Sequence, residues 1–380
     1  MYSPTITKIA AGLLLAAVAL SACGGDDDGG DSTTAAPSEA TTATSAGGEN
    51  VAATSGDACA PEDVTLIGQV RNETNPYEKA WLDGGDTFAA SVGLTQKRLT
   101  YGGDSQKQQD QIRQELSSSD TQCFVLNVLP NGDADTAPIV AAADDAEAFL
   151  VTQWNKPAEL AVTDHDRWVS HITYDGVDSG QQIADAMFEA MGGEGGIVAL
   201  QGILDTGAAK DRYKGLEEAL AANPDIELLD QQTANFSRTE ALTVMKTLIT
   251  KHGDKIKGVW TANDDMALGA IEALEAEGMT GVAVVGIDAV PEAVEAVAAG
   301  TMTATVSSDG PWQGGIGLAI GYCAAIGEID VAALPAENRA FFAEQTLITA
   351  DNAAEFASPT VDPAEFACDK VFDRVSAPLP

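Results

Sequence analysis

The side chains with the most evident chemistry in this chain stand just after segments that we predict to be strands. They are Arg71-Asn72, Gln153-Trp154-Asn155, Asp175, Asp205, Asn263-Asp264, Asp288 and Ser307-Ser308. Apart from Arg71, these residues carry no positive charge, and most are amides, carboxylates or aromatic rings. Carboxylates and amides hydrogen-bond hydroxyl groups, and aromatic rings cover C–H faces. The pattern predicts a site for a neutral, hydroxyl-rich ligand.

Motifs for covalent chemistry or metal binding do not accompany this pattern. The three histidines, His165, His171 and His252, form no His-Glu-x-x-His motif, and no Gly-x-Ser-x-Gly elbow occurs. The glycine-rich run at 192–196 precedes a predicted strand, whereas a dinucleotide-binding loop follows one. Residues 131–135 begin like a calcium loop but lack its later ligands. We therefore predict a protein that is not an enzyme and that uses no cofactor or metal.

The elements that must position these residues alternate between strand and helix from Val64 onward. We predict strands at 64–70, 97–101, 124–129, 148–152, 171–174, 197–200, 226–231, 258–260, 282–287 and 303–306. The predicted helices lie at 76–92, 105–116, 137–146, 181–191, 208–222, 239–251, 266–277, 291–299 and 314–326. Repeated strand–helix units predict parallel sheets with helices on both faces. Two such series predict an α/β fold of two doubly wound lobes, with ligands at the carboxyl ends of the strands.

The charge balance excludes one large class of partners. The chain has 58 acidic and 20 basic residues, for a formal net charge of -38. Binding of nucleic acid through its phosphates needs clustered lysine and arginine, so we exclude it. The acidic surface also argues against an anionic ligand, and its simplest role is to keep the protein soluble.

The N-terminus has the pattern of an export signal. Lys8 precedes an apolar run at 9–20 and small residues before Cys23, a stretch too short to span a membrane. The cysteine after small residues resembles the lipobox of bacterial lipoproteins, although an ordinary cleaved signal is the alternative. We predict a signal peptide at 1–22, lipidation of Cys23 and a disordered tether at 23–58 that spans roughly 30 Å. The protein would then lie outside the cytoplasm, anchored to the outer face of the cytoplasmic membrane or located in the periplasm.

Four further cysteines fit an oxidising compartment. Cys59, Cys123, Cys323 and Cys368 allow two disulfides in three pairings. Cys59 and Cys123 each stand just before a predicted strand, and both lie at one sheet edge if those strands are parallel neighbours. This reasoning favours Cys59–Cys123 and, by remainder, Cys323–Cys368. No cysteine pair has the spacing of a zinc site.

Several segments resemble those of one known family. They are Asn75-Pro76-Tyr77, Ala208 to Arg212, Asn235 to Thr239, Ala262 to Ala270 and Val285 to Asp288. Together they look like the ribose-binding protein group, which are type I periplasmic solute-binding proteins of ABC importers. The resemblance covers roughly 64–349 and is most specific at 263–270. Lac-repressor-type regulators share these lobes, but no helix-turn-helix precedes them in this sequence.

The resemblance implies how the chain is divided and what it does. Three crossings between lobes are expected near Tyr174-Asp175, Ser308-Asp309 and Gln345-Thr346. Lobe 1 would then comprise 59–174 and 309–345, and lobe 2 would comprise 175–308 and 346–358, with a C-terminal tail at 359–380. The lobes would close around the ligand by hinge bending, and a monomer would deliver it to an ABC permease.

The resemblance also implies roles for single residues. Tyr77 and Phe236 would be aromatic walls, Arg212 a fork donor to sugar oxygens, and Asp288 a hydroxyl acceptor. The remaining candidates are Asn72 at a strand end, Asn263, which is also a candidate helix cap, and Ser308 near the last crossing. Glu78 stands where the family has a second aromatic. It would bond a hydroxyl, or it would complete a capping box with Asn75.

The largest departure from the family is Gln153-Trp154-Asn155, where ribose binders carry an aspartate and an arginine. The change removes both charges and adds a ring, with a core role for Trp154 as the alternative. It puts ribose in doubt and favours another sugar or a polyol. Two other hypotheses stay open: a sensory receptor for a membrane kinase or chemoreceptor, and the same fold with a nucleoside or furanosyl signal as its ligand.

Overall fold

The structure is a computed structural model in which residues 58–118, 123–357 and 360–380 are described. The predicted signal peptide, the lipidation site Cys23 and the tether up to residue 57 lie outside these residues. Within the described parts, no helix is long and apolar enough to cross a membrane.

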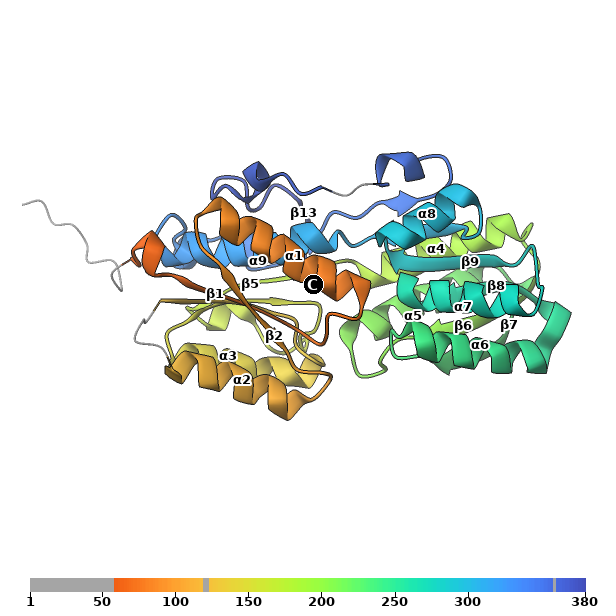
Figure 1. The fold of residues 1–380 in the computed structure, drawn as a ribbon, viewed down its shortest axis with the longest axis horizontal. Coiled ribbons are helices and arrows are strands. Elements are labelled where there is room, and N and C mark those ends of the chain that lie inside the picture. The colour runs from red at the N-terminus through yellow and green to blue at the C-terminus, as the bar shows by residue number, and fades with distance from the viewer. Residues whose placement is uncertain (1–57, 119–122, 358–359) are drawn as a thin grey trace, which may run out of the picture. The chain divides into compact units, whose positions relative to one another are not determined.

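The first lobe is built on a seven-stranded sheet with the order β13-β11-β5-β4-β3-β1-β2 (Figure 1). All neighbouring pairs are parallel except β11 with β13. Strands β3, β4 and β5 are buried at every position, as a strand covered by helices on both faces requires. The strands are β1 (Thr65–Val70), β2 (Gln96–Thr100), β3 (Phe124–Val128), β4 (Phe149–Gln153), β5 (Trp168–Thr173), β11 (Ala340–Ala343) and β13 (Val375–Pro378).

The second lobe has a six-stranded sheet with the order β12-β10-β9-β8-β6-β7. Only the pair β10 and β12 is antiparallel. The strands are β6 (Gly195–Gln201), β7 (Ile226–Thr233), β8 (Ile256–Thr261), β9 (Ala283–Asp288), β10 (Ala304–Ser307) and β12 (Leu347–Ile348). The two sheets confirm the predicted α/β fold with two doubly wound lobes.

Helices cover both sheets in pairs. In the first lobe α1 packs on α9 and α2 packs on α3, and in the second α4 packs on α5 and α6 on α7. The helices are α1 (Pro76–Ser91), α2 (Ser105–Ser118), α3 (Thr136–Asp145), α4 (Gly176–Ala190), α5 (Gly207–Ala222), α6 (Arg238–His252), α7 (Asp264–Ala276), α8 (Pro291–Ala299), α9 (Gly310–Ala325) and α10 (Ala336–Arg339). The short 3₁₀ turns are η1 (Pro61–Asp63), η2 (Asp133–Asp135), η3 (Val162–Asp164), η4 (Gly253–Lys255), η5 (Val331–Ala333), η6 (Ala353–Glu355) and η7 (Pro363–Phe366).

Glycines set how closely α1 approaches α9. A Cβ atom added at Gly84 of α1 would collide with the backbone of Pro311, and one added at Gly314 of α9 would collide with the backbone of Trp81. The two helices therefore touch backbone to backbone at these points, which only glycine permits. This contact places the N-terminal end of α1, and the residues before it, beside the start of α9.

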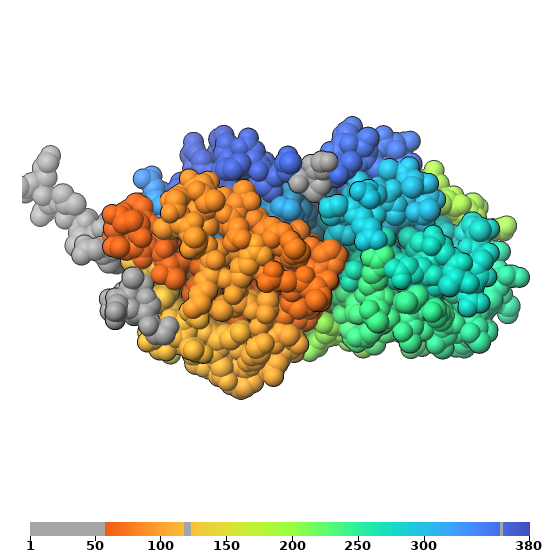
Figure 2. All heavy atoms as spheres, viewed as in Figure 1, coloured from red at the N-terminus to blue at the C-terminus, as the bar shows by residue number. Residues whose placement is uncertain are grey.

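The chain passes between the sheets at three described points. These lie between β5 and α4, between β10 and α9, and between β11 and β12. Residues 360–380, which the sequence predicts to be a C-terminal tail, belong to the first lobe. Turn η7 packs on α1 and α9, and β13 extends the first sheet. Figure 2 shows these C-terminal residues in dark blue along one edge of the face, close to α1.

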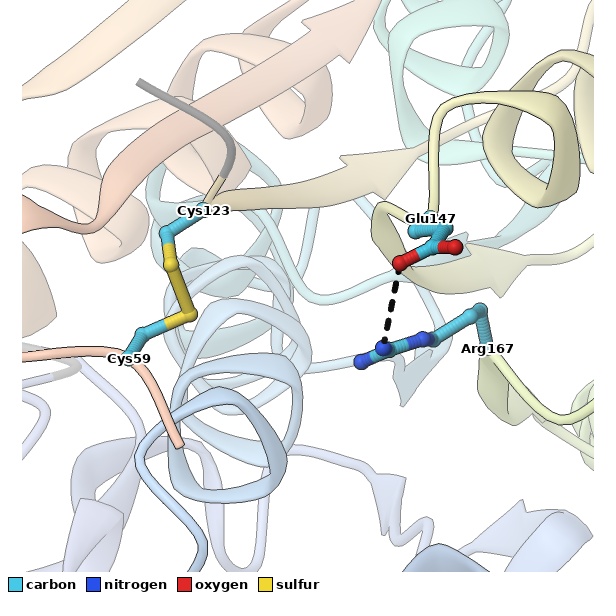
Figure 3. Close-up of a disulfide and its surroundings, with 4 residues drawn as sticks. All are labelled: Cys59, Cys123, Glu147 and Arg167. Atoms are coloured by element: carbon cyan, nitrogen blue, oxygen red, sulfur yellow. Dashed lines mark ion pairs between the residues drawn. A yellow bond between two sulfur atoms is a disulfide. The ribbon is translucent and has the colours of Figure 1, made fainter. Parts of the chain in front are cut away.

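Both disulfides have the favoured pairing. Cys59 bonds Cys123 at the edge where the parallel neighbours β1 and β3 begin, as the strand positions indicated (Figure 3). Cys323 in α9 bonds Cys368, which fixes the C-terminal segment to the first lobe. The ion pair between Glu147 and Arg167, 3.8 Å apart, joins the loops before β4 and β5.

Candidate ligand-binding site

A small pocket lies between the two lobes at the carboxyl ends of their strands. Its volume is about 60 Å³, and both lobes contribute to its walls. Lobe 1 supplies Arg71, Asn75, Tyr77, Glu78, Leu129, Trp154 and Asn155. Lobe 2 supplies Thr206, Ala208, Arg212, Phe236, Asn263 and Asp288.

The ends of the strands position the principal side chains. Trp154 directly follows β4, Asp288 ends β9, and Asn263 is the N-cap of α7, where its side chain accepts from Met266 N at 3.1 Å. Three residues of the wall have positive φ angles: Trp154 at 67°, Phe236 at 58° and Asp288 at 129°. Residues other than glycine rarely adopt positive φ angles, and the residues that do are concentrated at functional sites. The backbone geometry therefore supports a functional role for this pocket.

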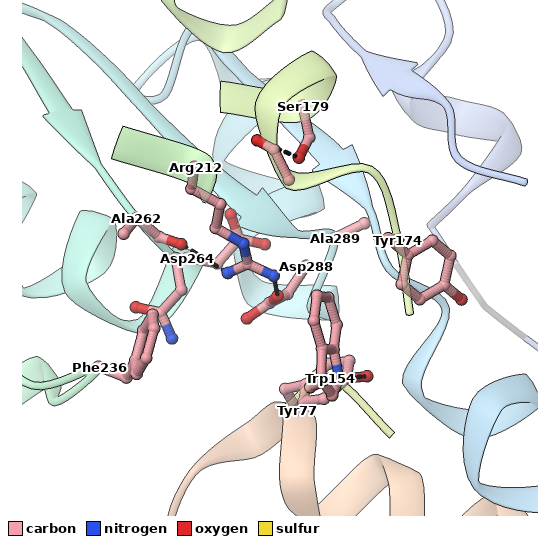
Figure 4. Close-up of polar contacts among 12 residues, drawn as sticks. Tyr77, Trp154, Tyr174, Ser179, Arg212, Phe236, Ala262, Asp264, Asp288 and Ala289 are labelled. Carbon is pink, nitrogen blue, oxygen red and sulfur yellow. Dashed lines mark hydrogen bonds and ion pairs between the residues drawn. The ribbon is translucent and has the colours of Figure 1, made fainter. Parts of the chain in front are cut away.

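Lobe 2 contributes a buried cluster of charge. One terminal nitrogen of Arg212 donates to Ala262 O at 2.6 Å, and the other lies 3.3 Å from Asp288 Oδ1 (Figure 4). Behind them, Asp264 accepts from Thr305 Oγ1 at 2.7 Å and from the backbone N–H of Val290 at 3.0 Å. Arg212, Asp264 and Asp288 are all buried. One guanidinium therefore faces two carboxyl groups in a dry environment.

The electrostatics of this cluster favour protonation of one carboxyl group. Burial raises the pKa of Asp264, and the charge of Asp288 raises it further. Burial also raises the pKa of Asp288, while the Arg212 guanidinium and a hydrogen bond from Asn263 lower it. The charge of Arg212 is thus matched mainly by Asp288, the carboxylate that lines the pocket. This pair can accept from and donate to hydroxyl groups of a ligand.

Lobe 1 contributes aromatic rings. Tyr77 and Trp154 meet edge to face with their ring centroids 6.0 Å apart, and Tyr174 lies 5.4 Å from Trp154 on the other side. The guanidinium carbon of Arg212 lies 4.8 Å from the Trp154 ring centroid and 6.0 Å from that of Phe236. The Trp154 ring lines the pocket opposite Arg212 of lobe 2 and also belongs to the buried hydrophobic core.

Glu78 does not form the capping box that was one of its two predicted roles. Asn75 caps α1, because its side chain accepts from the backbone N–H of Tyr77 and Glu78. The Glu78 carboxylate, however, accepts from the backbone N–H of Asn72 at 2.7 Å instead of returning to Asn75. It thus pins the loop between β1 and α1. Burial raises the pKa of Glu78 to about 7, although the hydrogen bond from Asn72 and the charge of Arg71 oppose the shift.

This pKa predicts a pH-dependent stability. The unfolded carboxyl group ionises near its ordinary pKa of 4.5, and the folded one near 7. Its contribution is therefore fully present below pH 4.5 and is lost as the pH rises through 7. Relative to Glu78→Gln, the protein should lose about 3 kcal/mol of unfolding free energy over this interval. Urea titrations at several pH values measure the difference.

A matched control separates this effect from general charge effects. Glu275 on α7 is an exposed glutamate. Glu275→Gln should therefore give a pH profile parallel to that of the unaltered protein. Parallel profiles for Glu78→Gln as well would show that Glu78 titrates normally.

The structure brings eight of the eleven candidate ligand residues into the pocket. They are Tyr77, Glu78, Trp154, Asn155, Arg212, Phe236, Asn263 and Asp288. Gln153 points instead into lobe 1, where it accepts from Trp81 Nε1 at 2.7 Å and donates to Asn127 and Gln313. As the last residue of β4, it faces α1 and α9.

The other two candidates also lie outside the pocket wall. Asn72 Oδ1 accepts from Thr74 N, Thr74 Oγ1 and Asn75 N, so the side chain forms an Asx turn within its own loop. Ser308 is buried at the second passage between the lobes, with its backbone N–H 3.3 Å from Asp288 O. The ligand roles assigned to Gln153, Asn72 and Ser308 from the sequence therefore have no support in the geometry.

The sequence does not mark the other wall residues as ligand contacts. Arg71 stands out only as the one positively charged strand end, and Leu129, Thr206 and Ala208 have no distinctive side-chain chemistry. The sequence predicts Asn75 as a helix cap, which the structure confirms. Its Nδ2 also donates to Phe236 O of the opposite lobe at 3.4 Å. Capping and wall contact are compatible for this residue.

A polar latch joins the lobes beside the pocket. Asp133 of lobe 1 accepts from Lys210 Nζ at 2.7 Å and from the backbone N–H of Gly207 at 3.1 Å. Asn155 Oδ1 accepts from the same N–H at 3.2 Å. Gly207 is the first residue of α5, so Asp133 also faces the positive end of a helix dipole. This latch joins the two lobes, and Asn155 is the member of it that also lines the pocket.

The latch predicts that closure depends on salt. Asp133→Asn keeps an acceptor for Gly207 but removes the negative charge. That charge stabilises the contact by about 1 kcal/mol in total, through the ion pair with Lys210 and the interaction with the helix end. Ligand affinity should therefore fall about fivefold at low ionic strength, and the difference should shrink in 0.5 M salt. Calorimetric titration of both proteins at two salt concentrations tests this. An equal affinity at low salt would show that the contact does not stabilise the closed arrangement.

A second cavity, of about 830 Å³, lies on the side of the passages between the lobes. Tyr77 and Asp288 border it as well, and Arg374 of the C-terminal segment lines it. Arg374 donates to Asp309 at 2.6 Å and to Glu365 at 2.5 Å. The C-terminal segment thus contacts the second passage, next to α9.

Comparison with known proteins places the chain. A sequence model described as "periplasmic binding protein domain" matches residues 70–329. The chain belongs to this family. The xylitol-binding protein of Mycolicibacterium smegmatis is 32% identical over 270 residues, which cover 71% of this chain and 74% of that protein. The ribose import binding protein of Salmonella typhimurium is 31% identical over 256 residues, covering 67% of this chain and 82% of that protein.

A solved structure extends the similarity beyond the matched domain. A twin-arginine translocation pathway signal protein from Burkholderia phytofirmans is 41% identical, with a TM-score of 0.80, and the match covers 83% of this chain and 98% of that one. This periplasmic binding protein is thus an extracytoplasmic solute-binding protein and not an enzyme, as predicted. Among the described residues, no group of three or more His, Cys, Asp or Glu side chains is placed to hold a metal ion.

Proposed function

We propose that this periplasmic binding protein captures a neutral sugar or polyol between its lobes and delivers it to an ABC permease. The observation that carries the proposal is the pairing of two chemistries across one pocket. Arg212, Asp288 and Asn263 offer hydrogen bonds from lobe 2, and the rings of Tyr77 and Trp154 face them from lobe 1. Hydroxyl groups and C–H faces are the two surfaces of a carbohydrate or polyol.

The size of the pocket implies a conformational step. A cavity of about 60 Å³ is smaller than the several hundred Å³ typical of small-molecule sites. The lobes therefore open, or Arg212 turns away from Trp154, when the ligand enters. Hinge motion about the three passages supplies such an opening, and the latch at Asp133 closes it again.

The ligands for which two relatives are named support a sugar or polyol as the ligand class. One is named for xylitol and the other for ribose import, a polyol and a pentose. The absence of the aspartate and arginine of ribose binders after β4 favours the polyol or a sugar other than ribose. Micromolar or tighter binding is expected, which corresponds to about -8 kcal/mol.

A ligand screen tests the proposal. Purified protein is heated in the presence of pentoses, hexoses, pentitols, inositols and nucleosides, and hits are titrated by calorimetry. A ligand at one hundred times its Kd should add about 2.7 kcal/mol of stability, visible as a clear rise in Tm. A response to nucleosides alone would overturn the sugar or polyol assignment, and no response to any compound would contradict the binding site itself.

The proposal includes a lipid anchor at Cys23. The small residues before this cysteine and the Gly- and Asp-rich stretch after it support lipidation and a tether. In cells, Cys23→Ser should move the protein from the membrane fraction to the soluble extracytoplasmic fraction. Mass spectrometry of the unaltered protein should find the chain beginning at Cys23 with a diacylglyceryl mass added. An unmodified N-terminus at another residue would contradict the anchor.

A further inference from the structure

The polar atoms of the two rings in the lobe 1 wall are directed into lobe 1. Trp154 Nε1 donates to the Tyr77 hydroxyl at 2.9 Å, and that hydroxyl donates to Gln313 Oε1 in α9. The face of Trp154 is turned to Arg212 of the opposite lobe (Figure 4). This wall therefore presents ring surface to a ligand, because its hydrogen-bonding atoms are already occupied.

The other polar side chains of the lobe 1 wall also have protein partners. The Arg71 guanidinium donates to Asn131 Oδ1 at 2.9 Å and to Asn131 O at 3.0 Å. Glu78 holds a backbone N–H of its own loop, and Asn155 bridges a carbonyl of lobe 1 and a backbone N–H of lobe 2. A ligand hydroxyl directed at this wall would lose its hydrogen bonds to water and form few hydrogen bonds to the protein in their place.

Lobe 2 has the opposite character. Arg212 Nε is buried and has no hydrogen-bond partner among the described residues. Its terminal nitrogen lies 3.3 Å from Asp288 Oδ1, a long contact that a ligand oxygen can improve on or replace. Asn263 stands beside Asp288 on the same side. The hydrogen-bonding capacity of the pocket is therefore concentrated on lobe 2.

We propose that the site selects polyols or sugars whose hydroxyl groups lie on one side, and that it favours hydrogen over hydroxyl at the carbons that face Tyr77 and Trp154. This inference rests on the proposed function and adds which lobe discriminates between ligands. The ligand class is a neutral, amphipathic carbohydrate, with a deoxygenated or C–H-rich edge against lobe 1. A hydroxyl on that edge is buried without a partner, whereas a missing hydroxyl on the other edge leaves Arg212 or Asp288 unsatisfied.

A series of deoxy compounds tests this inference. The parents are xylitol, ribitol, D-arabinitol and myo-inositol, and the tightest binder is compared by calorimetry with each of its monodeoxy counterparts. At least one counterpart should bind within threefold of the parent or more tightly, and at least one should bind a hundredfold more weakly. An affinity loss of tenfold or more on removal of each hydroxyl in turn would show that lobe 1 also recognises hydroxyls. This result would overturn the inference but not the proposed function.

The same series separates this inference from the proposed function. If no parent and no counterpart binds, the proposed function fails and the inference fails with it. A variant then tests whether the lobe 1 wall causes the tolerance for the missing hydroxyl. Trp154→Ala admits water to this wall, and the water supplies a hydrogen-bond partner for the hydroxyl of the parent ligand. Both ligands should bind that variant more weakly, and the tolerated deoxy compound should lose at least tenfold more than the parent. An unchanged ratio in a folded Trp154→Ala protein, checked by its thermal transition, would overturn the role of this wall.

Discussion

Asp288→Asn should weaken ligand binding by about a hundredfold while the fold is retained. The carboxylate is buried, ends β9 with a φ of 129° and lies 3.3 Å from Arg212. Hydrogen bonds to charged groups are worth about 1.5 to 3 kcal/mol each, so the loss of the charge at two bonds accounts for the factor. The amide keeps the shape and still accepts from Arg212, so the pocket is preserved. Calorimetric titration with the best ligand of the screen measures the change.

A control in the same lobe separates the pocket from general charge effects. Glu292 pairs with Arg238 at 2.7 Å on the surface, where 58% of the side chain is exposed. Glu292→Gln removes the same charge from an arginine pair outside the pocket and should leave affinity unchanged within twofold. If Asp288→Asn bound the ligand within threefold of the unaltered protein, Asp288 would not be a ligand-binding residue.

Arg339→Met should lower the unfolding free energy by about 4 kcal/mol. The Arg339 guanidinium is buried and donates to five backbone carbonyls. The acceptors are Val162 O, His165 O, Trp168 O, Val169 O and Val331 O. A buried acceptor without its partner costs about 1 to 3 kcal/mol, and methionine fills the space but donates nothing. Urea unfolding followed by circular dichroism tests the prediction.

A matched substitution of an exposed arginine provides the reference. Arg113 in α2 contacts Asp110 at 3.2 Å, and 49% of its side chain is exposed. Arg113→Met should change stability by less than about 0.5 kcal/mol, as is usual for surface positions. A similar effect of the two substitutions would mean that the carbonyl cluster at Arg339 contributes little to the fold.

Much of the fold follows from local sequence patterns. The strand–helix alternation predicts both sheets because buried parallel strands are short apolar runs and amphipathic helices have a different period. The start of α1 follows from Asn75-Pro76, a cap followed by a proline at the first helical position. The pairing of Cys59 with Cys123 follows from their places before neighbouring strands. Strand ends also indicated most of the pocket, since parallel strands bring their carboxyl ends together.

The sequence and the geometry differ where the register of a single residue or a distant partner determines the side-chain position. Gln153 and Trp154 are adjacent, but Gln153 ends β4 facing lobe 1, whereas the positive φ of Trp154 turns its ring to the pocket. Asn72 is retained by an Asx turn, for which Thr74 two residues later was a usable signal. Nothing in the sequence around Arg339 indicates its carbonyl partners, because they come from segments up to 177 positions away.

In the sequence, the return of the C-terminal segment to lobe 1 is indicated only by the favoured Cys323–Cys368 pairing, which links residue 368 to the 309–345 part of lobe 1. Strand β13 is only four residues long and pairs at the sheet edge. Its position is fixed by the Cys323–Cys368 disulfide and by Arg374 against Asp309. The contact between Arg374 and Asp309 and the pairing of β13 with β11 join distant segments, which no local pattern encodes.

A crystal structure of the complex with the best ligand of the screen tests the central claim most directly, because it shows which of the two cavities described above holds the ligand. We expect the ligand in the smaller pocket, with hydroxyls on Arg212 and Asp288 and a C–H face on Trp154. A ligand seated in the larger cavity beside Arg374, with the smaller pocket unaltered, would contradict the assignment of the site.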